Sequence, residues 1–310
     1  VNGALDNEGR IVSQQALAVQ AERVTNGGAL MAKVLALHGD LYNSGLLQGS
    51  QALTWDGVTF ASSADGQTIA GDSMALQGQD LTNEGLLAAK NLTLNTATLD
   101  NQGVLQGNDR LTLNTRSLLN GSTGKLFSGS TLDLDLDRLA NQGRFWVEGG
   151  LTLTGATAVT SGPMEAQALD VNRTGALYNQ GTLPAANAAH LRSATLTNSG
   201  DIAGQTVTLD AAGITNSGLI QGTQQAQATA GNITNAAGGK WPSGGELALN
   251  ADRLTNAGLL LRDTLRIAAA GLSHPGGTNG SHGPTAVCSD SLHTPAPHIV
   301  GASTVRRAGT

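Results

Sequence analysis

The chain has 310 residues and a formal net charge of −6, and only 13% of its residues are charged. It has no basic cluster, which makes nucleic acid a poor partner, and no apolar run as long as the roughly 18 residues of a membrane-spanning helix. Glycine is frequent, at 42 residues, and aromatic residues make up 3%, but leucine and isoleucine recur too regularly for a disordered chain.

Cys288 is the single cysteine, so no internal disulfide can form. This usage fits a reducing compartment, and it fits equally a protein that crosses a membrane unfolded. The chain begins at Val1 without a basic-then-apolar leader, and we expect it to be an excerpt or a processed piece of a longer protein.

A short motif, Leu-x-Asn-x-Gly or a close variant, recurs through most of the chain. Its asparagines are Asn7, Asn26, Asn43, Asn83, Asn101, Asn120, Asn141, Asn179, Asn198, Asn216, Asn235 and Asn256. They are 17 to 21 residues apart except for two steps of 40 and 38 residues, which predict degenerate copies at residues 63–66 and 159–162. Roughly fourteen copies therefore lie between residues 1 and 270, and a fixed period of this length indicates a repeat architecture.

Each unit alternates between apolar and variable positions. In the unit at residues 81–99, an aliphatic residue stands two positions before the asparagine and a large apolar residue two positions after the glycine. A second alternating pair, Leu92 and Leu94, follows, and no segment keeps the i, i+3, i+4 spacing of a helix. This period of two predicts about three short strands in each unit, with one side chain buried and the next in solvent.

Identical corners at identical spacing predict that successive units stack in register, each strand pairing in parallel with the same strand one unit along. Leucines and isoleucines would then form ladders in a narrow core. We expect each motif glycine at a corner with positive φ, where a Cβ is unfavourable. We expect each asparagine to tolerate left-handed geometry there, with its amide bonded to its own backbone or to the asparagine one coil away. The motif asparagines are thus interpreted as structural corner residues.

The units Leu-Thr-Asn-Glu-Gly-Leu-Leu (81–87), Leu-Asp-Asn-Gln-Gly-Val-Leu-Gln-Gly (99–107) and Ile-Thr-Asn-Ser-Gly-Leu-Ile-Gln-Gly (214–222) resemble haemagglutinin repeats. Such repeats occur in filamentous haemagglutinin-type adhesins and in contact-dependent growth-inhibition exoproteins. The resemblance covers residues 1 to about 270. It implies an all-β fold, a right-handed parallel β-helix (solenoid) of about fourteen coils of ~19 residues. It also implies two-partner secretion, in which an outer-membrane transporter passes the unfolded exoprotein outward.

Residues 271–310 depart from the repeat. They contain Pro275, Pro284, Pro295 and Pro297, four histidines (His274, His282, His293 and His298) and Cys288. Because proline cannot donate to a sheet ladder, we expect the solenoid to end near Leu272 and an irregular tail or linker to follow. Two alternatives are a metal site formed by Cys288 and the histidines, although no tight ligand pair supports it, and a sequence end that is not native.

Three aspartates, Asp133, Asp135 and Asp137, alternate with leucines in the run 132–138. Alternation places the leucines inward and the carboxylates outward. Paired outward carboxylates could act as acid and base in a carbohydrate-cleaving β-helix, or could contact Ca²⁺ weakly. A solvated face that discourages lateral aggregation is the simpler interpretation.

Two tryptophans follow corners. If Phe145 points inward, Trp146 points outward, where it could be a binding contact or could fill a wider coil. Trp241 stands at a similar place, before Pro242. His38 and His190 are isolated in the sequence, and we assign no catalytic role to them.

These features together favour a structural shaft segment of a secreted adhesin or contact-dependent inhibition exoprotein on the bacterial surface, associated with the outer membrane. Such a shaft would present distal binding or toxin domains. We expect no enzymatic activity, no cofactor, no metal and no nucleic acid, because spacings of 17 to 21 residues leave no room for a walled cleft. The expected partners are the secretion transporter and a host-cell or neighbouring-bacterium surface. One alternative is a shaft that itself binds a glycan or receptor, and another is a carbohydrate-active β-helical enzyme.

Overall fold

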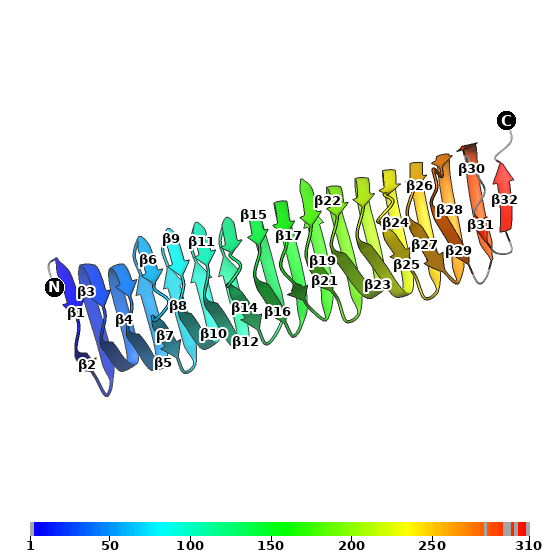
Figure 1. The fold of residues 1–310 in the computed structure, drawn as a ribbon. Coiled ribbons are helices and arrows are strands. Elements are labelled where there is room, and N and C mark those ends of the chain that lie inside the picture. Colours follow the sequence, from blue (N-terminus) through cyan, green and yellow to red (C-terminus); the bar gives the residue numbers. More distant parts are fainter. Residues whose placement is uncertain (1–2, 282–283, 294–298, 301–302, 308–310) are drawn as a thin grey trace. The chain divides into compact units, whose positions relative to one another are not determined.

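The computed structural model describes residues 3–281, 284–293, 299–300 and 303–307, and these residues form two compact units, 1–154 and 155–310. Every regular element described is a β-strand, and the pairings of neighbouring turns are parallel (Figure 1). The described residues make about fifteen turns with a spacing of about 19 residues. The prediction of an all-β parallel solenoid is therefore confirmed. No described segment is a helix with the length and apolar character needed to cross a membrane.

Unit 1 contains sixteen short strands and the start of a seventeenth. They are β1 (Ala4–Asn7), β2 (Arg10–Val12), β3 (Ala16–Asn26), β4 (Ala29–Asn43), β5 (Leu46–Asp56), β6 (Thr59–Ser62), β7 (Gln67–Ala70), β8 (Ser73–Gln77), β9 (Asp80–Asn83), β10 (Leu86–Asn95), β11 (Thr98–Asn101), β12 (Val104–Asn114), β13 (Ser117–Asn120), β14 (Lys125–Ser128), β15 (Leu132–Asn141), β16 (Arg144–Val147) and β17 (Gly150–Thr160).

Unit 2 begins within β17 and repeats the same order of strands. These are β18 (Met164–Glu165), β19 (Ala168–Arg173), β20 (Ala176–Asn179), β21 (Thr182–Pro184), β22 (Ala188–Asn198), β23 (Asp201–Asn216), β24 (Leu219–Asn235), β25 (Lys240–Pro242), β26 (Glu246–Asn256), β27 (Leu259–Arg262), β28 (Thr264–Ser273), β29 (Thr278–Ser281), β30 (Thr285–His293), β31 (Ile299–Val300) and β32 (Ser303–Arg307).

Each coil has three faces, which the coil at residues 98–114 illustrates. Face A is β11, which ends at the motif asparagine Asn101. Face B is the first part of β12 (104–107), and face C is its second part (110–114), after a break in register. Leu99 on face A, Leu105 on face B and Leu111 on face C all point into the core. Three short apolar stretches per period of about 19 residues therefore enclose one narrow interior.

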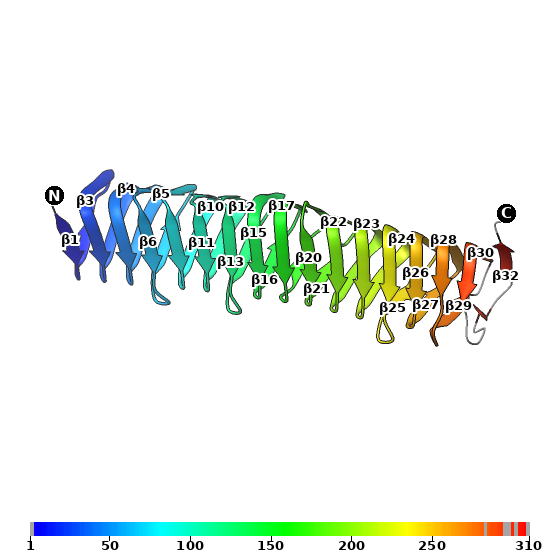
Figure 2. The same ribbon diagram turned by 90° about the horizontal axis from the view of Figure 1, so that it is seen from above.

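The spacing between paired residues varies from 17 to 21, and part of this variation comes from the length of the corner after face A, while another part comes from register shifts between faces B and C. Most corners place the glycine two residues after the asparagine, as in Asn101 and Gly103. Three corners contain two more residues, at 63–66, 121–124 and 236–239. In Figure 2 these longer corners project beside β6, β13 and β25. The repeat thus absorbs insertions at one corner without disturbing the strand register.

The core consists of columns of apolar side chains that continue from coil to coil. On face B of unit 1, Leu30, Leu47, Leu87, Leu105 and Leu126 are fully or almost fully buried. Burial of such a side chain contributes about 1.5–3 kcal/mol. Larger residues occupy the same columns in places: Trp241 pairs in register with Leu260 and is completely buried, so it fills the core and is not a surface contact.

The motif glycines are needed for close packing and not for positive φ, which corrects the sequence-based reason. Among the described residues, positive φ occurs at Gly3, Gly39, Gly155 and Gly276, none of which follows a motif asparagine, and no other residue type adopts it. A Cβ on Gly103 would instead lie 2.1 Å from the carbonyl oxygen of Gly85, one coil before. Successive corners therefore stack backbone on backbone, and a side chain at this position would push the coils apart.

The expected end of the solenoid near Leu272 is wrong for the described residues, because the parallel ladder continues. Strand β28 pairs with β30, and β27 pairs with β29. Pro275 lies in a corner, and Pro284 contributes only its carbonyl oxygen, which accepts from the Leu265 N–H at 3.2 Å. Neither position requires an N–H donor, so proline does not interrupt the ladder there. Pro295 and Pro297 lie outside the described residues.

One buried position carries an unexpected charge. The last residue of face B is small in most coils, for example Gly107, Ser128 and Ser243, but in β27 it is Arg262, which is only 3% exposed. Its Nη1 atom donates to the Leu260 carbonyl oxygen, while Nε and Nη2 have no partner among the described residues. Burial lowers the pKa of Arg262 from its usual value to about 10. This guanidinium therefore destabilises its coil.

We expect Arg262→Ser, which matches Ser243 of the preceding coil, to raise the free energy of unfolding by about 1–3 kcal/mol. Above about pH 10 the unfolded chain still holds the Arg262 proton that the folded chain releases, so the stability of the parent rises with pH there. The variant should lose this rise. Urea unfolding at neutral and alkaline pH measures both effects, with the exposed Arg253→Ser as the control. Equal stability of Arg262→Ser and the parent would contradict the argument.

Candidate functional site

The motif asparagines form a buried side-chain ladder along face A. In unit 1 the Asn7 amide nitrogen Nδ2 donates to Asn26 Oδ1 at 2.7 Å, and Asn26 donates to Asn43 at 2.8 Å. The ladder resumes from Asn83 through Asn101 and Asn120 to Asn141 at 2.8–2.9 Å. In unit 2 it runs through Asn179, Asn198, Asn216, Asn235 and Asn256 at 2.7–2.9 Å. Most of these amides also donate to a nearby backbone carbonyl, as Asn26, Asn101 and Asn198 do, so these side chains hold successive corners together.

The two degenerate copies interrupt this ladder. The copy expected at residues 63–66 takes Ser62 as its ladder residue, paired with Asn43 and Asn83. The copy at 159–162 takes Thr160, which pairs with Asn179. Because neither hydroxyl reaches the next coil, Asn83 Oδ1 and Asn179 Oδ1 are buried without a partner, as is Ser62 Oγ. The asparagine pattern alone could not reveal these orphaned atoms.

We expect Ser62→Asn to stabilise unit 1 by about 1–2 kcal/mol, because the new amide would donate to Asn83 Oδ1 and accept from Asn43. The corner of Ser62 has the same length as the corners of Asn120 and Asn235, which accommodate asparagine. Thermal or urea unfolding measures the gain, and Ser63→Asn on the neighbouring residue is the control. In this coil Thr68 occupies the core position that leucine occupies in the neighbouring coils. If Ser62→Asn proves destabilising, the larger asparagine side chain does not fit beside Thr68.

The aspartate run lies on face C as alternation requires. Leu132, Leu134 and Leu136 are each 1% exposed, and the three aspartates are exposed. Asp133 and Asp135 line a shallow groove of about 490 Å³ with residues of face C of neighbouring coils and of the corner between faces C and A. The hydroxyl of Thr154 donates to Asp135 Oδ1 at 2.9 Å. The structure thus brings Asp133 and Asp135 together on one surface, while Asp137 lies outside this groove.

Trp146 lies on face B and points outward. Phe145 is completely buried, whereas Trp146 is 49% exposed. Its ring meets Phe127 of the preceding coil edge to face, with centroids 5.4 Å apart, and the Arg144 guanidinium lies 5.4 Å from the Trp146 ring centroid. Lys125 pairs in register with Arg144. We call Lys125, Phe127, Arg144 and Trp146 the aromatic–cationic patch.

The patch ends two outward columns that run along face B of unit 1. One column contains Arg10, Ala29, Leu46, Gln67, Leu86, Val104, Lys125 and Arg144, and the other contains Val12, Met31, Gln48, Ile69, Ala88, Gln106, Phe127 and Trp146. Within unit 1 these columns hold three cations, Arg10, Lys125 and Arg144. Sequence reasoning singled out Trp146 but missed its partners, which the 19-residue offset between Phe127 and Trp146 could have identified.

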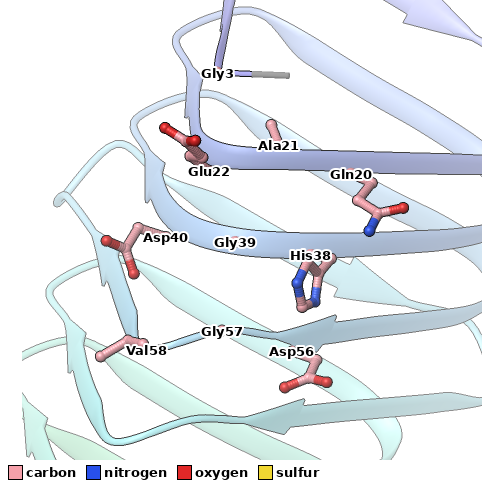
Figure 3. Close-up of a pocket in the computed structure, with 10 residues that line it drawn as sticks. All are labelled: Gly3, Gln20, Ala21, Glu22, His38, Gly39, Asp40, Asp56, Gly57 and Val58. Atoms are coloured by element: carbon pink, nitrogen blue, oxygen red, sulfur yellow. The ribbon is translucent and has the colours of Figure 1, made fainter. Parts of the chain in front are cut away.

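A second groove, of about 790 Å³, lies near the start of unit 1 (Figure 3). Gln20, His38 and Asp56 stand in one register column on its wall, and Gly39 and Gly57 form part of its floor. His38 is therefore not isolated in space, although the sequence suggested so. Asp40 lines the same groove, and its Oδ1 accepts from the Thr59 backbone N–H at 3.1 Å. The groove is lined by polar and acidic groups.

The residues considered for a metal site are dispersed. Cys288 and His293 are exposed on β30, whereas His274 is buried at a corner, where Nδ1 donates to the Asn256 carbonyl oxygen at 2.9 Å. His282 and His298 lie outside the described residues. Within the described part of the chain, no three or more His, Cys, Asp or Glu side chains are grouped to hold a metal ion. At this corner the asparagine ladder continues to Asn279, whose Oδ1 accepts from Asn256 Nδ2 at 3.1 Å.

Comparison with known proteins finds relatives over most of the chain. "Deoxyribonuclease CdiA" of Dickeya dadantii (strain 3937) is 33% identical over 261 residues, 81% of this chain and 8% of that protein. "Toxin CdiA" of Escherichia coli is 28% identical over 302 residues, 94% of this chain and 10% of that protein. "tRNA nuclease CdiA" of Escherichia coli O6:K15:H31 (strain 536 / UPEC) is 28% identical over 321 residues, 82% of this chain and 10% of that protein. No family model and no solved structure matches.

The chain therefore spans about a tenth of the length of the curated relatives it matches. The expectation of no enzymatic activity is contradicted, because two of these relatives are named as nucleases. Those names also point to nucleic acids, so the expected absence of a nucleic-acid partner has no support at the level of the whole protein.

The resemblance found in the repeat units is confirmed by these relatives and by the parallel solenoid together. The haemagglutinin-type repeat predicted the fold, and the relatives share the segment over 81–94% of this chain. The chain is homologous, over most of its length, to CdiA contact-dependent inhibition proteins, and its β-solenoid is consistent with a haemagglutinin-repeat shaft.

Proposed function

We propose that this chain is a shaft segment of a secreted, cell-surface contact-dependent inhibition exoprotein, and that it presents distal binding or toxin domains away from the producing cell. The observation that carries the proposal is the parallel pairing of the same faces from coil to coil within each unit. Every coil repeats the three faces of its neighbour, so such a structure gains length by addition of coils and needs no enlarged core.

The corners support a structural role for the segment. The corner after face A varies only by two residues among the described coils, and the longest corners are the three with residues 63–66, 121–124 and 236–239. Long loops that would build a separate domain on the side of a coil are therefore missing from this corner. The buried asparagines stabilise the corners internally, which leaves the outer faces free to vary.

The cysteine content and the pairing of neighbouring coils suit export in an unfolded state through an outer-membrane two-partner secretion transporter. With Cys288 as the single cysteine, no internal disulfide can form before or during passage. Each coil pairs mainly with the coil before it, so folding can begin at one end and propagate without distant contacts. The surface of a neighbouring target cell is the second proposed partner.

An in-register deletion within the full exoprotein tests the shaft. Leu86, Val104, Lys125 and Arg144 occupy equivalent positions in successive coils. Deletion of residues 86–143 joins Gly85 to Arg144, removes three coils and keeps the register. We expect normal secretion and surface display, with the shaft shorter by about 14 Å at a strand spacing of ~4.8 Å. Electron microscopy of the displayed filaments and a target-cell inhibition assay measure the result.

The matched control deletes residues 88–144 and joins Leu87 to Phe145 within face B. Both side chains point inward at equivalent positions, so the junction forces the residues on one side of it to the wrong face, because the side-chain period of a strand is two. We expect this variant to misfold. If the in-register variant is displayed and folded but no longer inhibits target cells, the segment is more than a spacer, and the shaft proposal fails.

A second function is favoured by the exposed Trp146. In this alternative the shaft itself contacts a glycan or receptor on another cell. An exposed indole with an aromatic neighbour and an adjacent guanidinium is typical of a contact surface, and the aromatic–cationic patch has this composition.

A further inference from the structure

We propose that a groove on face A of unit 1, beside Tyr42, binds a hexose unit of a neutral glycan. The groove has a volume of about 290 Å³. It lies on a face other than that of the aromatic–cationic patch, so the inference goes beyond both proposed functions. Its failure would leave both of them standing.

The groove exists because a small residue stands between two larger ones in an outward column of face A. Tyr42 pairs in register with Ala61, and Ala61 pairs with Thr82. Tyr42 is 43% exposed, and all three residues line the groove. Tyr42 and Thr82 are two coils, about 9.6 Å, apart at a strand spacing of ~4.8 Å. The short side chain of Ala61 therefore leaves a depression that admits a pyranose ring against the tyrosine.

The corner after face A forms the other side of the groove. Ser44, Ser63 and Glu84 stand at this corner in three successive coils and line the groove. The middle corner, at residues 63–66, is one of the three long ones and projects beside β6 (Figure 2). This long corner follows Ala61 in the same coil, so the wall and the depression occur together.

The lining combines one aromatic ring with hydroxyl groups and a carboxylate. Its aliphatic hydroxyl groups come from Thr25, Ser44, Ser63 and Thr82. Each hydroxyl can donate and accept a hydrogen bond, whereas the exposed Glu84 carboxylate only accepts and can bind two adjacent sugar hydroxyls. The Tyr42 ring offers an apolar face to the C–H groups of a sugar. This set of groups matches a ligand with one apolar face and many hydroxyls.

A buried hydroxyl lies at the base of the groove. Ser62 and Asn43 line the groove, and each is 2% exposed. The Oγ atom of Ser62 has no hydrogen-bond partner among the described residues. A buried polar atom without a partner costs free energy. A sugar hydroxyl that reaches the base of the groove supplies the missing hydrogen bond.

The charges near the groove disfavour an anionic ligand. Besides Glu84, acidic residues of face A and its corner lie close by: Asp40, Asp65, Asp80 and Asp100. Arg23, which pairs in register with Asp40, is the cation beside Thr25 and is outnumbered. An ammonium ligand is also a poorer match than a sugar, because aromatic recognition of such cations uses a cage of rings. Tyr42 is the single aromatic residue in the described lining.

Two neutral oligosaccharides, maltohexaose and β-1,4-galactohexaose, are the probes, and they differ in the orientation of the 4-hydroxyl. Hexagalacturonate and spermine are the anionic and cationic comparisons. In calorimetry with the 310-residue chain, we expect a neutral probe to bind and both charged ones to bind more weakly. Tyr42→Ala and Glu84→Gln should each weaken binding about tenfold or more. Ala61→Leu fills the depression while Phe60 and Ser62 stay in place, and it should weaken binding equally.

Three controls match these variants. Tyr178→Ala removes a tyrosine with 45% exposure from the equivalent position of unit 2, where the corners carry Gln180 and Ser199 in place of a carboxylate. Glu8→Gln removes a carboxylate from the equivalent corner position of an earlier coil, and Ala140→Leu adds the same side chain in the same outward position of a later coil. All three should bind like the parent, and unchanged circular dichroism should show that every variant folds.

The inference is overturned if neither neutral oligosaccharide binds, or if Tyr42→Ala or Ala61→Leu binds like the parent. It is also overturned if hexagalacturonate binds as tightly as the neutral probes. Binding of spermine that is as tight and is lost in Glu84→Gln would make the groove a cation site and would overturn the inference as well.

Discussion

Leu99→Asp is expected to abolish cooperative folding of its coil and to destabilise unit 1 by more than about 4 kcal/mol. Leu99 is 2% exposed on face A and pairs in register with Leu81 and Leu118, which are also buried. A carboxylate in this column has no cation within the core to pair with, and burial of an unpaired charge is among the most costly substitutions known. Urea unfolding and amide hydrogen exchange across residues 80–120 measure the effect.

The matched control is Asp100→Leu, one residue further along the same strand. Asp100 points outward and is half-buried at the surface. Its replacement should change the free energy of unfolding by less than about 0.5 kcal/mol. If Asp100→Leu proves more damaging than Leu99→Asp, the assignment of inward and outward positions on face A is wrong.

Asn101→Ala is expected to lower the stability of unit 1 by about 3 kcal/mol, because it removes several buried hydrogen bonds at once. Asn101 Nδ2 donates to Asn120 Oδ1 at 2.8 Å and to the Gly103 carbonyl oxygen at 3.2 Å, and Asn101 Oδ1 accepts from Asn83 at 2.9 Å. The substitution therefore leaves polar atoms of two neighbouring coils without their partner. Urea unfolding measures the loss.

Asn91→Ala on the exposed side of β10 is the control for this substitution and should be nearly neutral. A loss below about 1 kcal/mol for Asn101→Ala would show that the ladder contributes little, and that the apolar columns alone hold the coils in register.

Much of the fold could be predicted from the sequence because a solenoid repeats one local pattern. The alternation around Leu99 and Leu105 indicates which side chains are buried, and the period of about 19 residues indicates which strands pair. The reason for Gly103 could not be predicted, since the carbonyl oxygen that excludes a Cβ belongs to Gly85, one coil away. The effect of Pro284 was also misjudged, because it depends on which backbone groups the ladder uses at that place.

The candidate site, like the fold, could be predicted from the sequence only in part. The outward direction of Trp146 follows from alternation with Phe145. Its contact with Phe127 and the nearby guanidinium of Arg144 require the register between coils and the side-chain conformations. The buried Arg262 and the orphaned oxygen of Asn83 are departures at single coils, and a periodic pattern describes only what the coils share.

The asparagine ladder has a direction. In the links described above, the amide nitrogen of the earlier coil donates to the oxygen of the later one, from Asn7 to Asn26 and from Asn235 to Asn256 alike. The side-chain dipoles of a run therefore add, as they do in a chain of aligned amides. A finished coil offers its free amide N–H group to the asparagine that follows it in the chain. The ladder thus acts as a one-way template, on which a chain that emerges amino terminus first can add its coils in order.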